Sequence, residues 1–172
     1  MVNYRSGNLI DFVDEYLEDS PVIIPHITND INVWGSGFVV ALDKAWPESE
    51  FGDSAPRVVD STAGNVLGKV SYALPEDGVV IANMCAQTGI RPMSTGPRSK
   101  VVRKPIRYSA LVSCMNSVAN MAQGITSDEG VRPHILAPKF GSLRAGGNWD
   151  FIEELIEEIW IEFPVTVVTY QE

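Results

Sequence analysis

Two glycine-rich segments contain the residues best suited to chemistry in this chain. The first reads His26-Ile-Thr-Asn-Asp-Ile-Asn-Val-Trp-Gly-Ser-Gly37, and the second reads Gly141-Ser-Leu-Arg-Ala-Gly-Gly147. Glycine allows backbone N–H groups to approach a ligand closely, and the N-terminus of a following helix adds partial positive charge. Each segment lies between an apolar run and an amphipathic one, so both are candidate phosphate-binding loops. A diphosphate has oxygens for two such loops at once.

His26 is the side chain of the first loop best suited to catalysis. An unperturbed histidine pKa of about 6.5 allows proton transfer or attack on phosphorus at neutral pH. A core histidine that donates to a backbone carbonyl is an equally open interpretation. Asn29 is suited to bind ribose hydroxyls or to cap a turn, whereas Asn32 favours the turn role. Asp30 could position a water molecule, or its side chain could simply be exposed to solvent. Trp34 could line a ribose site or pack beneath the loop.

The composition is that of an ordinary globular domain without a membrane anchor. The chain has 172 residues, enough for one compact core, and 45% of them are hydrophobic. No apolar run approaches the ~20 residues of a membrane span, and the N-terminus lacks a secretory signal pattern. Cys85 and Cys114 form neither a CxxC pattern nor a cluster with histidine. This predicts no metal site, no disulfide framework and a cytoplasmic location.

The charge is acidic overall but unevenly distributed. A net charge of -9 argues against general nucleic-acid binding, which depends on basic surface. Basic residues nevertheless concentrate between Arg91 and Arg107, and acidic residues concentrate between Asp150 and Glu162. Both stretches are expected to form solvent-exposed faces, and the basic stretch could also form the rim of a site that attracts anions. With its prolines and no periodicity, Arg91–Lys104 is expected to be a mobile surface loop.

Alternating strand and helix patterns surround the two loops. Apolar runs predict strands at Val2–Tyr4, Val22–Ile27, Ile135–Phe140 and Val165–Tyr170. Periodic apolar residues predict helices at Asn8–Leu17, Gly37–Trp46, Leu111–Ala122 ending near Gly124, and Trp149–Phe163 with Asn148 as N-cap. Pro75-Glu-Asp-Gly78, between Lys69–Leu74 and Val79–Met84, predicts a β-hairpin. Residues Glu48–Asn65 are expected to form a short helix and a loop.

This order of elements predicts an α/β fold. A mixed sheet with helices on both faces accommodates the alternation and the hairpin. In such sheets, ligands bind outside the carboxyl ends of the strands. Both glycine-rich loops follow a strand, so we expect them at that edge.

The motifs resemble those of the macro domain family over nearly the whole chain. The resemblance lies in Ser6-Gly-Asn-Leu9, in His26-x-x-Asn29 followed by Trp34-Gly-Ser-Gly37, in Ile81-Ala-Asn-Met84, in Pro105-Ile-Arg-Tyr108, and in Pro138-x-Phe-Gly-Ser-Leu-Arg-Ala-Gly-Gly-Asn-Trp149. It is strongest to the branch that includes the yeast ADP-ribose 1''-phosphate phosphatase and terminal ADP-ribose protein glycohydrolase, with phage and bacterial relatives. It implies a single macro domain over residues 1–172, with a three-layer α/β/α fold, a mixed central sheet and an ADP-ribose cleft at the top of the sheet.

The resemblance also implies which residues meet the ligand. The expected contacts are Asn8 and Leu9 at the adenine; Asn29 and Trp34 at the distal ribose; Gly35, Ser36 and Gly37 in the first phosphate loop; and Gly141, Ser142, Leu143, Arg144, Ala145, Gly146 and Gly147 in the second. Asn8 stands where the family has an acid that binds the adenine amino group. An amide carbonyl is still an acceptor, so we expect weaker adenine selectivity.

The implied chemistry is hydrolysis of ADP-ribose 1''-phosphate to ADP-ribose and phosphate. His26 matches the family histidine associated with phosphatase action, where it would serve as nucleophile or general acid while Asn29 orients the ribose. The glycohydrolase branch uses a lysine and an aspartate, but this chain has Cys85-Ala-Gln-Thr88 and Ala145 at those places. The alternatives are a non-catalytic reader of ADP-ribose or ADP-ribosylated protein, and a mono-ADP-ribosyl-protein hydrolase. No cofactor, metal, nucleic acid or membrane partner is expected.

Overall fold

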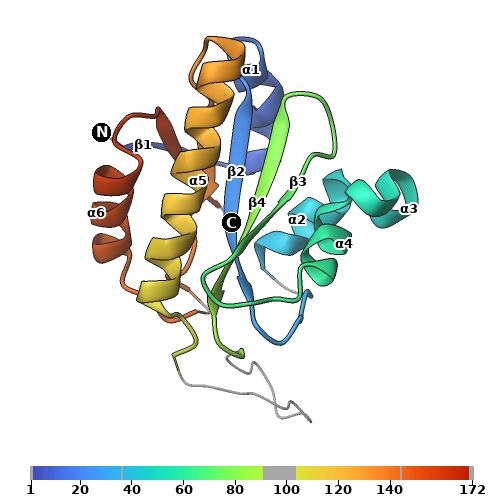
Figure 1. Ribbon diagram of the computed structural model, residues 1–172, viewed down its shortest axis with the longest axis vertical. Helices are drawn as coiled ribbons and strands as arrows, with labels where there is room; N and C mark the ends of the chain where they lie inside the picture. Colours follow the sequence, from blue (N-terminus) through green and yellow to red (C-terminus); the bar gives the residue numbers. More distant parts are fainter. Residues whose placement is uncertain (1, 36, 91–103, 144, 171–172) are drawn as a thin grey trace.

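The described part of the chain forms one sheet with helices on both faces (Figure 1). The computed structural model describes residues 2–35, 37–90, 104–143 and 145–170. Within these residues the sheet has six strands in the order β1-β6-β5-β2-β4-β3. The strands are β1 (Val2–Ser6), β2 (Val22–Asn29), β3 (Val70–Ala73), β4 (Val79–Gln87), β5 (His134–Pro138) and β6 (Val165–Thr169).

The sheet is mixed, as the sequence predicts. Neighbouring strands run parallel except β3 and β4, which are antiparallel. The predicted hairpin joins these two strands, and Gly78 at its turn has a φ of 83°, a left-handed conformation that suits glycine. The carboxyl ends of the five parallel strands therefore lie at one edge of the sheet.

The helices form the two outer layers. Their bounds are η1 (Leu9–Phe12), α1 (Val13–Leu17), α2 (Phe38–Ala45), α3 (Glu48–Phe51), η2 (Gly52–Ser54), α4 (Pro56–Thr62), α5 (Tyr108–Glu129) and α6 (Trp149–Ile159). Figure 1 shows α5 and α6 crossing the near face of the sheet, while α1 and α2 belong to the opposite face. None of the helices in the described residues is long and apolar enough to cross a membrane.

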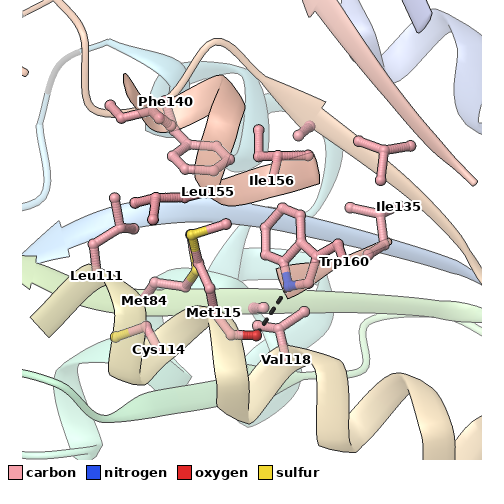
Figure 2. Close-up of a cluster of buried hydrophobic side chains, with 14 of the residues drawn as sticks. Met84, Leu111, Cys114, Met115, Val118, Ile135, Phe140, Leu155, Ile156 and Trp160 are labelled. Atoms are coloured by element: carbon pink, nitrogen blue, oxygen red, sulfur yellow. Dashed lines mark hydrogen bonds between the residues drawn. The ribbon is translucent and has the colours of Figure 1, made fainter. Parts of the chain in front are cut away.

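Each face of the sheet has its own hydrophobic core. In the larger core, side chains of α5 and α6 pack with Trp160. The indole N–H of Trp160 donates to the Met115 carbonyl at 2.9 Å (Figure 2). The smaller core joins η1, α1 and α2 to the other face, with Leu9 and Leu42 buried. Buried apolar surface of this kind is the main stabilising term in folding.

The predicted end of α5 at Gly124 is wrong. The helix continues through Gly124 to Glu129, and it ends at Gly130, which has a φ of 74° and the left-handed conformation typical of helix ends. A glycine inside a helix costs only about 1 kcal/mol relative to alanine, and the packing of α5 outweighs that cost. The apolar face of α5 was correctly predicted, since Leu111, Met115 and Val118 are fully buried.

Candidate site at the carboxyl edge of the sheet

The two glycine-rich loops leave neighbouring strands at the same edge. The first loop follows β2 and the second follows β5, and these strands are parallel partners. The side chain of Ile27, near the end of β2, reaches the second loop, because a Cβ placed on Gly141 would lie 2.9 Å from Ile27 Cδ1. The loops are therefore on one side of the molecule and close together, as they must be if both are to contact one diphosphate.

A proline in β2 helps to separate the strands that carry the loops. The hydrogen-bonded register between β2 and β5 is limited to Val22↔His134 and Ile23↔Ile135, whereas β2 pairs with β4 as far as Asn29. Pro25 lies two residues after Ile23 and has no amide hydrogen with which to extend the ladder. The carboxyl halves of β2 and β5 are thus free to diverge towards the two loops.

Asn29 shapes the first loop through its own side chain. Its Nδ2 donates to the Val33 carbonyl at 2.8 Å, and its Oδ1 accepts from the amides of Ile31 and Val33 at 3.2 and 3.0 Å. Asn32 has a φ of 56°, which confirms its predicted turn role. The Asn29 amide is therefore engaged within the loop, and its predicted contact with ribose stays a prediction.

Trp34 connects the first loop to α2. Its indole N–H lies 3.0 and 3.1 Å from the two carboxylate oxygens of Asp43. The indole also meets His26 edge-on, with ring centroids 5.5 Å apart. These contacts fix the segment immediately before Gly35, and the predicted contact of Trp34 with ribose stays a prediction.

The first-loop glycines have open surroundings. A Cβ on Gly35 or on Gly37 would meet no atom within 4 Å, although Gly37 has a φ of 84° that favours glycine. Phe38 begins α2 directly afterwards, and the first turn of this helix has no side-chain N-cap. Such amides are available to an anion in a way that capped amides are not.

Glycines of the second loop serve internal packing instead. A Cβ on Gly147 would lie 2.4 Å from the Gly141 carbonyl oxygen, and one on Gly141 would meet three isoleucine side chains at 2.9 to 3.1 Å. The Gly147 amide donates to Gly141 at 2.8 Å, and the Gly146 amide donates to Leu143 at 3.3 Å. The earlier positions Ser142 and Leu143 are thus the better candidates for ligand contact, and the Leu143 side chain is 81% exposed.

The end of the second loop is fixed on both sides. Ala145 is buried, and its carbonyl accepts from the Ile106 amide at 3.0 Å. Asn148 caps α6 as predicted, because its Oδ1 accepts from the Phe151 amide at 3.2 Å. Ser36, Arg144 and most of the predicted Arg91–Lys104 loop lie outside the described residues, so their expected roles stay predictions.

Asp30 connects two loops, which is neither of the two roles that the sequence suggested for it. The Asp30 carboxylate accepts from the Thr88 hydroxyl at 2.8 Å and from the Gly89 amide at 2.7 Å. The Asp30 amide in turn donates to the Gln87 carbonyl at 3.0 Å. These bonds join the start of the first loop to the turn that follows β4.

His26 lies beneath the first loop rather than on its surface. It is 2% exposed, its Nε2 is 2.5 Å from Asn83 Oδ1, and the rings of Trp34 and Phe38 pack against it. Burial lowers the pKa of His26 to about 4, although the hydrogen bond with Asn83 opposes this shift. The imidazole is therefore neutral at neutral pH.

Two buried atoms near this position lack a hydrogen bond of good geometry. Among the described residues, Nδ1 of His26 has no hydrogen bond, and the Thr28 hydroxyl has none of good geometry, although it interacts with the side chains of Asp60 and Cys85. The sequence signal for Asn83 was its polarity within the apolar run of β4, which points to a buried hydrogen-bond partner. Cys85, which follows on β4, is a poor nucleophile, because burial raises the pKa of its thiol to about 12.

The predicted adenine contacts lie at the far end of the same edge. Asn8 follows β1, and its Oδ1 accepts from the Ile10 amide at 3.1 Å, which caps η1. Leu9 is 4% exposed and belongs to the smaller core. Asn8 is therefore the more exposed of the two, and Tyr170 lies 79% exposed just after β6, the strand beside β1.

Solved structures share this fold over nearly the whole chain. A protein of unknown function from Bacteroides thetaiotaomicron is 30% identical, with 98% of each chain covered and a TM-score of 0.75. A macrodomain protein from Streptomyces coelicolor is 28% identical, with 100% of this chain and 99% of that chain covered and a TM-score of 0.68. No family model matches the sequence. The chain belongs to the macro domain family.

Two further similarities extend to more distant proteins. An uncharacterized 17.5 kDa protein from the tk-vs intergenic region of Enterobacteria phage T4 is 23% identical over 171 residues, which are 99% of this chain and 97% of that protein. DarTG from Thermosipho africanus, solved in complex with ADP-ribose, is 13% identical, with 86% of this chain and 37% of that chain covered and a TM-score of 0.53. The latter similarity concerns the fold alone.

Proposed function

We propose that this macro domain binds ADP-ribose at the carboxyl edge of its sheet. The observation that carries the proposal is the position of the two glycine-rich loops after the neighbouring parallel strands β2 and β5. Membership of the macro domain family supports it, as does the ADP-ribose complex of the distantly similar DarTG. The adenine would lie near Asn8 and Leu9, and the diphosphate between the two loops.

The first loop would supply most of the diphosphate contacts. Gly35 and Gly37 leave open space around the backbone, and the first turn of α2 has no side-chain cap. Backbone amides at a helix N-terminus attract anions through hydrogen bonds and through the helix dipole. Ser142 and Leu143 would add amides from the second loop, because the Gly146 and Gly147 amides already donate within it.

The proposed reaction is hydrolysis of ADP-ribose 1''-phosphate, with His26 and Asn29 as the catalytic residues. His26 lies under the loop that would hold the diphosphate, and its neutral imidazole has an unpartnered nitrogen. Backbone amides aimed at a phosphoryl group would also stabilise the charge that develops in the transition state. No other residue of the first loop offers a nitrogen base.

A non-catalytic reader of ADP-ribose is the second candidate. The 2% exposure of His26 favours it, because a catalytic nitrogen has to reach its substrate. Hydrolysis of mono-ADP-ribosyl protein is the third candidate. The candidates share the binding site and differ only in whether phosphate, ADP-ribose or nothing is released.

Calorimetry and product assays separate these candidates. We expect ADP-ribose to bind more tightly than adenosine monophosphate, because only ADP-ribose spans both loops. Gly35→Val should weaken ADP-ribose binding without loss of folding, since the new side chain enters open space. Gly124→Ala is the matched control, because its new Cβ also meets no atom within 4 Å but lies within α5, away from the edge. Equal affinity in the wild type and in Gly35→Val would refute the binding proposal.

The reaction is tested on the same proteins. Phosphate release from ADP-ribose 1''-phosphate that is lost in His26→Gln supports the phosphatase proposal. Tight ADP-ribose binding with no product from phosphate or ester substrates selects the reader. Release of ADP-ribose from a modified protein selects the mono-ADP-ribosyl hydrolase.

A further inference from the structure

The hydrogen bonds of Asn83 determine which way its side-chain amide faces. Its Nδ2 lies 3.2 Å from the Pro56 carbonyl oxygen and 3.2 Å from Ser71 Oγ. A carbonyl oxygen only accepts hydrogen bonds, so the nitrogen of the amide must face Pro56. The carbonyl oxygen of Asn83 therefore faces His26, where it lies 2.5 Å from Nε2.

This orientation fixes the tautomer of His26. Asn83 Oδ1 is an acceptor only, so His26 Nε2 must carry the hydrogen of their shared bond. A buried imidazole with a lowered pKa holds a single proton at neutral pH. Nδ1 consequently has a lone pair and no proton, and it is an acceptor that has no donor within the described residues.

The imidazole ring of His26 lies beneath the first loop. Trp34, from that loop, packs edge-on against the imidazole, and Phe38, at the start of α2, packs beside it with ring centroids 5.8 Å apart. The cover over His26 is thus made by the segments that flank Gly35 and Gly37. A ligand that reorganises this loop would therefore uncover the imidazole.

We propose that Asn83 is a positioning residue, which holds His26 as the Nε2–H tautomer so that Nδ1 accepts a hydrogen bond from a hydroxyl group of the ligand at the first loop. The ligand half of this proposal rests on the proposed ADP-ribose function, in which the distal ribose, one of the two hydroxyl-bearing sugars attached to the diphosphate, lies at the first loop. In this arrangement the resting His26 has no proton to give at its free nitrogen. It can accept a proton or attack phosphorus, but it cannot serve as the initial general acid.

Nitrogen NMR of the histidine side chains tests the tautomer directly. The chain has two histidines, so the His134→Gln variant assigns both sets of ring signals by difference. In the free wild-type protein at neutral pH, we expect His26 to show the Nε2–H pattern with an unprotonated Nδ1. An Nδ1–H pattern, or a charged ring, would overturn the role of Asn83.

Two substitutions at Asn83 separate positioning from mere packing. Asn83→Asp keeps an acceptor facing Nε2, so the Nε2–H tautomer should persist and the pKa of His26 should rise. Asn83→Leu removes the acceptor, so both tautomers should appear. An unchanged Nε2–H pattern in Asn83→Leu would refute the proposal. If Asn83→Leu does not fold, the wild-type spectrum and the pKa change in Asn83→Asp still decide the question.

Titration with ADP-ribose tests the ligand contact. We expect the Nδ1 signal of His26 to move towards the hydrogen-bonded range, while the His134 signals stay in place. Calorimetric binding without a change at Nδ1 would refute the contact and leave the proposed function intact. Absence of calorimetric binding would remove the contact together with the proposed function, while the tautomer of the free protein would still establish or refute the role of Asn83.

Discussion

The burial of His26 makes a quantitative prediction about stability and pH. Its pKa falls from 6.5 to about 4 in the folded protein. One pKa unit corresponds to about 1.4 kcal/mol, so the neutral ring contributes about 3 kcal/mol to the free energy of unfolding. Because the folded pKa is depressed, the unfolded chain binds more protons between these two values. The contribution is complete above about pH 6.5 and falls as the pH drops towards about 4.

Urea unfolding at several pH values measures this contribution. Between about pH 7.5 and pH 5, His26 alone should lower the free energy of unfolding by about 2 kcal/mol. The variant His26→Gln removes the titration but keeps a side-chain N–H that can donate to Asn83. The difference between the wild type and this variant in the pH dependence of the free energy of unfolding measures the contribution of His26.

Other titrating groups act on both proteins and cancel in that difference. Burial also lowers the pKa of His134 to about 4, but this ring is more exposed, so solvent screens its interactions and we expect a smaller contribution. Burial raises the pKa of the Asp60 carboxyl, so protonation of Asp60 stabilises the fold as the pH falls, which is the opposite sign. His134→Gln is the matched control with a smaller expected change. Equal pH dependence in the wild type and in His26→Gln would refute the buried, neutral state of His26.

Three further substitutions test how the loops are built. Gly147→Ala should lower the free energy of unfolding by about 1 to 3 kcal/mol in urea titrations, because its Cβ would lie 2.4 Å from a backbone oxygen; an unchanged midpoint would contradict this packing. Pro25→Val supplies a missing amide, so the β2–β5 ladder should lengthen and the new amide should exchange slowly with solvent; fast exchange would show that the strands diverge for another reason. Asp30→Asn should lower the free energy of unfolding by about 1 kcal/mol and speed hydrogen exchange of the Gly89 amide. An amide that stays protected would contradict the role of Asp30 in holding the two loops together.

The layers of the fold follow closely from local sequence patterns. Apolar runs and the Pro75–Gly78 turn predicted the strands and the hairpin, because burial and turn chemistry are local properties. The predicted end of α5 at Gly124 was wrong because glycine is an ambiguous signal. Only the left-handed conformation at Gly130 distinguishes a stop from a tolerated interior position, and tertiary packing decides which glycine adopts it.

The side-chain contacts of the site were less accessible from sequence. The separation of β2 and β5 depends on which strand lies opposite Pro25, and that neighbour is known only from the sheet order. The bonds of Asp30 and Asn83 reach the turn after β4 and the start of α4, which are distant along the chain. Sequence spacing identifies such polar residues in apolar surroundings, but it does not identify their partners.

The two loops use glycine for different physical reasons, and this bears on how the site recognises a ligand. Gly35 leaves space around the backbone, whereas Gly147 allows the second loop to close on its own carbonyl. Two side chains of the first loop are engaged within the protein, since Asn29 binds its own loop and Trp34 binds Asp43. A diphosphate between the loops would therefore meet mainly backbone amides.

Asn29→Ala should then weaken ADP-ribose binding by loosening the loop, with faster exchange of the Val33 amide even in the free protein. Unchanged exchange alongside weaker binding would instead identify Asn29 as a direct ligand contact.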